Sequence, residues 1–109
     1  MSRVLAWVLF CAFAAAAGAY ESFTLAPSLW DRPRSARAVL DQPAMRQAAE
    51  LYLARPASRL VIHHGNGLEP LAQAEEIRAW LMALGIDGAR VSLKNDIGPK
   101  EPLRMEVVK

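Results

Sequence analysis

The sequence predicts a small α/β (α+β) domain, a two-layer βαβαββ-type sandwich with two helices packed on one mixed sheet. Leu60–His63 is apolar at consecutive positions, which is typical of a central strand covered on both faces. Gly65-Asn66-Gly67 ends that strand, and Pro70–Leu84 then repeats apolar residues at helical spacing. Gly85 favours the end of this helix, and Ala89–Leu93 supplies a returning strand. The two strands and the helix between them predict a βαβ unit.

Elements on either side complete the predicted sheet. Pro43–Ala54 has an apolar stripe and predicts the first helix, with Asp41 placed to cap its start. Leu103–Val108 alternates apolar and polar residues, as a strand with one buried face does. The first strand is formed either by residues 22–26, before Pro27, or by residues 36–40.

The N-terminus has the pattern of a signal peptide. Met1-Ser2-Arg3 is a short positive head, Val4–Ala16 is an apolar run, and Ala17-Gly18-Ala19 fits a signal-peptidase site. We therefore expect residues 1–19 to be removed after Ala19, residues 20–42 to form an N-terminal extension, and residues 43–109 to form the α/β domain. The alternative is an uncleaved anchor, although the run is shorter than the roughly 20 residues that cross a bilayer.

Composition limits the function classes. The one cysteine, Cys11, lies inside the apolar run, so the mature chain would have no disulfide. Net charge is only +2, and the charges of both signs are interspersed. This pattern gives no indication of nucleic-acid binding. The chain is expected to be periplasmic, with contact to the membrane only through the signal segment if that segment is retained.

One stretch resembles a known family. Ala74-x-x-Ile77-x-x-Trp80-Leu81-x-x-x-Gly85-Ile86, followed by Arg90-Val91-Ser92, is similar to the second helix and following strand of the OmpA-like domain. Leu53–Gly65 resembles the end of that family's first helix and the strand leading to its ligand loop. The resemblance covers roughly residues 43–108, and it implies the same two-layer fold in a peptidoglycan-associated envelope module.

The departures concern the ligand site. The family binds the diaminopimelate group of peptidoglycan with an aspartate before the second helix and an arginine in its first turns. Here Gly65–Pro70 contains no aspartate, and Gln73 stands where the arginine would be. A neutral amide does not replace the charge-assisted bonds of a guanidinium. Peptidoglycan thus remains a possible partner, but none of the family's binding residues carries over.

Two histidines form the most conspicuous polar pair. Adjacent residues of a strand point to opposite faces, so His63 and His64 are poorly placed to share one metal. We expect a buried, hydrogen-bonded histidine and a strand-end histidine, with no metal and no cofactor. No nucleophile and base lie in a recognisable context, so no enzymatic activity is expected.

Two groups of residues are candidates for binding. Trp30, Arg32 and Arg34 form a partner-binding candidate, because tryptophan and arginine are enriched at interface hot spots. The alternative is that Trp30 only covers the core. The loop between His63 and Gln73 offers a ligand site with His64, Asn66, Glu69 and Gln73.

Together these features predict an exported, non-catalytic binding or assembly module of the cell envelope with an envelope protein as partner. Alternatively, the loop binds a peptidoglycan fragment or another small anion.

Overall fold

The structure, a computed structural model, describes residues 21–108, so the predicted signal peptide lies outside the described residues. Short 3-10 turns at Pro27–Asp31 and Gly88–Arg90 accompany the helices and strands. The strands are β1 (Glu21–Thr24), β2 (Arg59–His64), β3 (Val91–Asn95) and β4 (Arg104–Val108), and the helices are α2 (Ala36–Leu40), α3 (Pro43–Ala54) and α4 (Leu68–Ala83).

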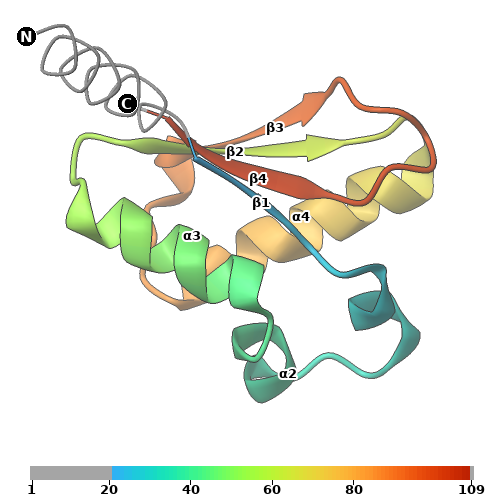
Figure 1. Ribbon diagram of the computed structural model, residues 1–109, viewed down its shortest axis with the longest axis horizontal. Helices are drawn as coiled ribbons and strands as arrows, with labels where there is room; N and C mark the ends of the chain where they lie inside the picture. Colours follow the sequence, from blue (N-terminus) through green and yellow to red (C-terminus); the bar gives the residue numbers. More distant parts are fainter. Residues whose placement is uncertain (1–20, 109) are drawn as a thin grey trace, which may run out of the picture.

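The four strands form one mixed sheet in the order β1-β4-β2-β3. β2 and β3 are parallel, with α4 as the crossover between them, whereas β4 runs antiparallel to both β1 and β2. Figure 1 shows the sheet as one layer and the helices as the other. The predicted fold class, a small α/β sandwich on a mixed sheet, is confirmed.

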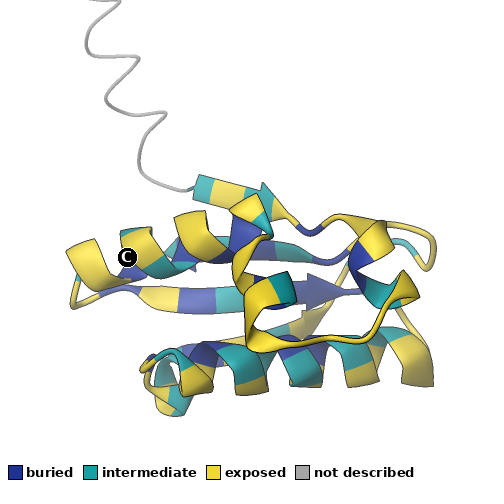
Figure 2. Cartoon of the chain, turned by 90° about the horizontal axis from the view of Figure 1, so that it is seen from below, coloured by how far each residue is buried: buried dark blue, intermediate teal, exposed yellow. Residues whose placement is uncertain are grey.

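The core lies between the sheet and its helices. α3 contacts β1 and β4, and α4 contacts β2 and β3. Buried residues form stripes on the strands and on the inner sides of the helices (Figure 2). The fully buried side chains include Met45, Ala48, Leu60, Ile62, Ile77, Leu81 and Met105, each 0% exposed. The helical phases expected from the sequence are therefore correct at Met45 and Ala48 of α3 and at Ile77 and Leu81 of α4.

The first strand is Glu21–Thr24, which agrees with the alternative of residues 22–26, and the other alternative, a strand at residues 36–40, is wrong. Those five residues form α2, whose start is capped by Ser35 because its Oγ accepts the Ala38 amide at 3.2 Å. The local cap thus outweighs the strand propensity of this short apolar segment. Leu25 and Val39 are each 1% exposed, so residues before α3 contribute to the same core.

Element ends also differ from the prediction. Asp41 ends α2, and Gln42 precedes α3 without a side-chain cap, so Asp41 is not the cap of α3. Helix α4 begins at Leu68, two residues before Pro70, because proline is tolerated in a first turn. Gly85 has φ +98°, as expected of the glycine after a helix.

Helices cover only one face of the sheet among the described residues, contrary to the expectation for β2. Val61 is partly exposed on the open face, whereas Leu60 and Ile62 are fully buried under the helices. In the stretch from 21 to 108, no helix is long and apolar enough to span a membrane.

Candidate functional site

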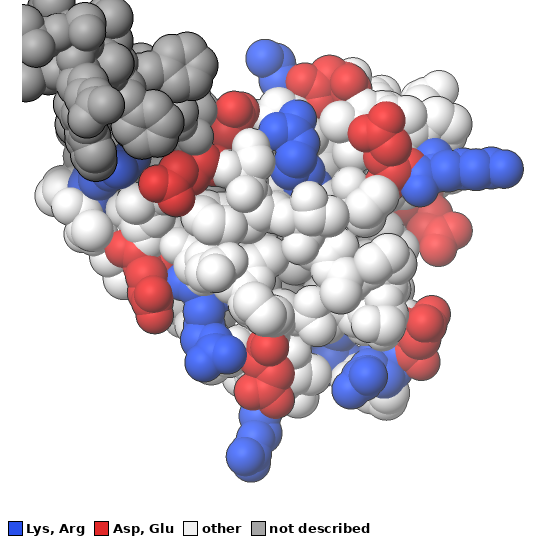
Figure 3. All heavy atoms as spheres, viewed as in Figure 1, with Lys and Arg blue, Asp and Glu red and all other residues white. Residues whose placement is uncertain are grey.

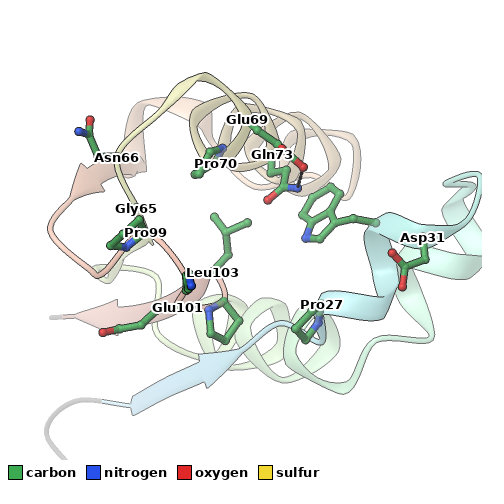
Figure 4. A pocket seen from close by; sticks show the side chains of 13 residues that line it. Pro27, Asp31, Gly65, Asn66, Glu69, Pro70, Gln73, Pro99, Glu101 and Leu103 are labelled. Atoms are coloured by element: carbon green, nitrogen blue, oxygen red, sulfur yellow. Dashed lines mark hydrogen bonds between the residues drawn. The ribbon is translucent and has the colours of Figure 1, made fainter.

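A pocket of about 440 Å³ lies where β2 ends and α4 begins. Four separate segments surround it: the Pro27–Asp31 turn, the loop after β2, the first turns of α4 and the loop between β3 and β4 (Figure 4). Its charged lining consists of Asp31, Glu69, Glu101 and Lys100. We call this the Trp30 pocket, after the aromatic residue in its wall.

Trp30 is positioned by its own turn and by a cation. The preceding Leu29 is 1% exposed and anchors the Pro27–Asp31 turn in the core. The guanidinium carbon of Arg34 lies 5.1 Å from the centre of the Trp30 ring, a cation–π distance. Trp30 therefore packs partly on the core and also lines the pocket, and its role in binding a partner stays a prediction.

Arg34 serves an internal contact. Its Nε and Nη2 atoms both donate to the Glu76 carboxylate on α4, the latter at 3.0 Å. The Trp80 indole N–H also donates to Glu76 at 3.2 Å. Hydrogen bonding from Arg34, with a smaller contribution from Trp80, holds the pKa of Glu76 below its ordinary value despite partial desolvation. Arg34 thus fixes the connector before α2 onto α4, and of the predicted trio Arg32 is exposed outside the pocket lining.

The loop and helix residues predicted as a ligand site separate into two groups. Asn66, Glu69 and Gln73 line the Trp30 pocket, and Gln73 donates a long hydrogen bond of 3.5 Å to Glu69 (Figure 4). His64 does not join them. It is 6% exposed, and its Nδ1 lies 2.9 Å from the Gly65 carbonyl oxygen that accepts from it.

The fourth wall of the pocket was missed by sequence reasoning. This wall is Pro99–Leu103, which closes one side of the pocket. The Gly and Pro content of the segment predicts only a loop. A Cβ at Gly65 would lie 2.8 Å from the Gly98 carbonyl oxygen, so the two loops approach at backbone distance. Only glycine at position 65 permits this contact. Gly65 was therefore the one feature of the sequence that could have indicated a second segment packed against the loop after β2.

His63 lies on the opposite face of β2 from His64. It is 5% exposed, with Nδ1 2.7 Å from Asp96 Oδ1 and Nε2 3.1 Å from Glu106 Oε1. The expectation of a buried, hydrogen-bonded histidine is therefore met. Within residues 21–108, no group of three His, Cys, Asp or Glu side chains is arranged to hold a metal ion.

The charges of the Trp30 pocket indicate what it can bind. Three carboxylates and one ammonium group line it, alongside an indole and two side-chain amides. This combination favours a ligand with a positive charge and hydrogen-bonding groups. Elsewhere, on the face seen in Figure 3, the described positive and negative side chains are intermingled.

No protein-family model matches the chain, and no curated protein sequence matches it.

Proposed function

We propose that this chain is an exported, non-catalytic binding module of the cell envelope, OmpA-like in its arrangement, and that the Trp30 pocket is its ligand site. The ligand is a basic or amine-bearing segment of an envelope protein. The export half of the proposal rests on the head, apolar run and small-residue site of residues 1–19.

The observation that carries the binding half is the composition of the pocket. It combines Trp30 with three carboxylates against one lysine, in a space of about 440 Å³. An ammonium group gains both from carboxylates and from the face of an indole. The same excess of negative charge disfavours a small anion at the loop before Gln73.

A peptidoglycan fragment is the second candidate, because stem peptides carry free ammonium groups. Gln73 lines the pocket where the resemblance calls for an arginine, so the carboxylate of such a ligand would lack a guanidinium partner. Lys100, from another segment, is the one basic side chain in the lining. A basic protein segment therefore fits this pocket better.

The test uses two small probes that differ in side-chain charge. N-acetyl-lysine methylamide and N-acetyl-glutamate methylamide are titrated separately into the purified protein, and amide and indole chemical shifts are followed by NMR. We expect the lysine probe to shift the Trp30 indole N–H and the Gln73 side-chain amide. The glutamate probe should leave both in place.

Trp80 provides the internal control. It is the tryptophan whose indole N–H is bonded to Glu76, outside the pocket lining. Its signal should shift much less than that of Trp30 with the lysine probe, because Trp80 is linked to the pocket only through Glu76 and Arg34. Equal shifts with both probes, or a shift of Trp80 as large as that of Trp30, would refute the pocket as a site for a positively charged group.

A further inference from the structure

His63 is buried on a face of the sheet that no described helix covers. It is paired in register with Lys94 on β3 and Arg104 on β4. Its side chain is only 6% exposed, with the carboxylates of Asp96 and Glu106 against the two ring nitrogens. A histidine on an open sheet face is thus enclosed by acidic partners from two different segments.

Both ring nitrogens face acceptors. Asp96 Oδ1 lies 2.7 Å from Nδ1 and Glu106 Oε1 lies 3.1 Å from Nε2. A carboxylate can only accept, and only the protonated imidazolium has two N–H donors. The neutral ring would turn a lone pair toward one carboxylate, so one of the two contacts must be given up. Both hydrogen bonds, to Asp96 and to Glu106, can therefore form only while the His63 ring is protonated.

Asp96 is held in its ionised form by His63 and, to a smaller extent, by the basic side chains around the ring. The hydrogen bond from His63 is the main reason that the pKa of Asp96 lies below its ordinary value, with smaller contributions from the charges of His63, Lys94 and Arg104. Arg104 is itself engaged, since its Nη1 donates to Ser22 Oγ at 3.0 Å. Asp96 therefore offers a carboxylate throughout the pH range in which histidines titrate.

Asp96 connects this cluster to the Trp30 pocket. It opens the loop between β3 and β4, and the same loop continues into the Pro99–Leu103 wall. Glu106 is held within strand β4, whereas Asp96 is in the loop with a side chain 39% exposed. Loss of the contact to Asp96 therefore acts on a loop residue, whereas Glu106 stays in a strand that is paired on both sides.

We propose that His63 is a pH-dependent clasp, which holds the loop at residues 96–103 against the sheet while its ring is protonated and releases it when the ring becomes neutral. Through this loop, His63 regulates the wall of the Trp30 pocket. The regulatory consequence rests on the proposed function of that pocket, whereas the clasp itself does not.

The amide of Glu101 reports on the loop without any ligand, because it donates to the Gly98 carbonyl at 3.0 Å. Its hydrogen-exchange protection factor is measured by NMR from pH 5.5 to 8.0, and the ring signals of both histidines are followed in the same samples. We expect protection to fall by about fivefold with rising pH, as when a charge-assisted hydrogen bond weakens. The midpoint should follow the His63 ring and not the His64 ring.

Two variants define the cause. Asp96→Asn and His63→Gln should each give low Glu101 protection at both ends of the range and abolish the pH dependence. Asp41→Asn, at an exposed aspartate at the end of α2, should behave as wild type. Because Asp96 is exposed, Asp96→Asn should fold, and it tests the clasp even if His63→Gln does not fold.

Constant protection in the wild type, or pH dependence retained in Asp96→Asn, would overturn the clasp. If Glu101 protection depends on pH as expected but the lysine probe causes no shifts, the proposed ligand site is refuted and the clasp is not. If the lysine probe binds but Glu101 protection does not change with pH, the clasp is refuted and the ligand site is not.

Discussion

The guanidinium of Arg34 contacts the carboxylate of Glu76 through two nitrogens across 42 positions of sequence. This ion pair joins the connector before α2 to helix α4, and Arg34 also lies over the Trp30 ring. The position of the aromatic wall of the pocket is thus coupled to a charge on α4.

Glu76 should contribute to the pH dependence of stability. Its pKa in the folded protein is lowered from 4.5, chiefly by Arg34, so its ionised form is stabilised by folding. That contribution is present above the unfolded value and is lost as pH falls through the folded value. Between about pH 5 and pH 3, the free energy of unfolding should decline more steeply in the wild type than in Glu76→Gln.

Urea denaturation at a series of pH values checks this. Arg34→Gln removes the hydrogen-bond donor that lowers the pKa of Glu76, so it should also make the free energy of unfolding less dependent on pH between about pH 5 and pH 3. Parallel profiles for the wild type and both variants would contradict the coupling.

Leu81 should be essential for packing α4. It is 0% exposed, so Leu81→Ala should lower the free energy of unfolding by about 2–5 kcal/mol. Leu68→Ala, the same change on the same helix at a residue 86% exposed, is the matched control and should cost less than about 0.5 kcal/mol. Chemical denaturation measures both. Similar costs for the two variants would mean that the phase of α4 is wrong.

Gly65 should be intolerant of a side chain. In Gly65→Ala the new Cβ would meet backbone atoms of Gly98 and Pro99 at 2.8 and 3.0 Å. Backbone cannot rotate away as a side chain can, so the loop must shift, at a cost of about 1–3 kcal/mol.

The control for this change is Gly98→Ala, whose Cβ would meet the flexible side chain of Glu101 at 3.1 Å. It should be the milder variant by thermal unfolding. An equal or larger loss of stability in Gly98→Ala would contradict the close approach of the two loops.

Export should remove the first 19 residues. N-terminal sequencing and intact mass of the protein recovered from the periplasm should give Tyr20 as the first residue, because Ala17-Gly18-Ala19 fits the cleavage site. Full-length protein recovered in the membrane fraction would indicate an anchor.

Purified peptidoglycan sacculi should not retain this protein through diaminopimelate. Gln73 supplies only neutral hydrogen bonds where a guanidinium would pair with the ligand carboxylate. Leaving that carboxylate without a charged partner should cost ~3 kcal/mol of binding free energy, which lowers the affinity more than a hundredfold. Co-sedimentation should leave the wild type in the supernatant, and Gln73→Arg should increase the bound fraction. Wild-type binding that free diaminopimelate displaces would favour the peptidoglycan alternative.

Sequence reasoning recovered the elements whose signal is periodic. The apolar spacing in α3 and α4 and the alternation in Leu103–Val108 depend on burial, which leaves a pattern in the chain. The sequence leaves the first strand open between residues 22–26 and 36–40, because the five residues from 36 to 40 show no apolar period. The cap at Ser35 makes them a helix.

The candidate site was only partly predictable for a different reason. Asn66, Glu69 and Gln73 are close in sequence and could be grouped from it, but Trp30 and Pro99–Leu103 reach the same pocket from distant segments. His63 acquires Asp96 and Glu106 through loop and strand pairing, over 33 and 43 positions. Such contacts depend on tertiary packing and leave no local pattern.

The most direct test of the Trp30 pocket compares two charge-neutral variants of one helix. Glu69 lines the pocket, whereas Glu75 is an exposed residue of α4 outside its lining. Glu69→Gln should raise the Kd for N-acetyl-lysine methylamide by about threefold, the effect of one exposed ion pair, while Glu75→Gln leaves it unchanged. Equal effects of the two variants, or no effect of Glu69→Gln, would contradict the assignment of this pocket as the ligand site.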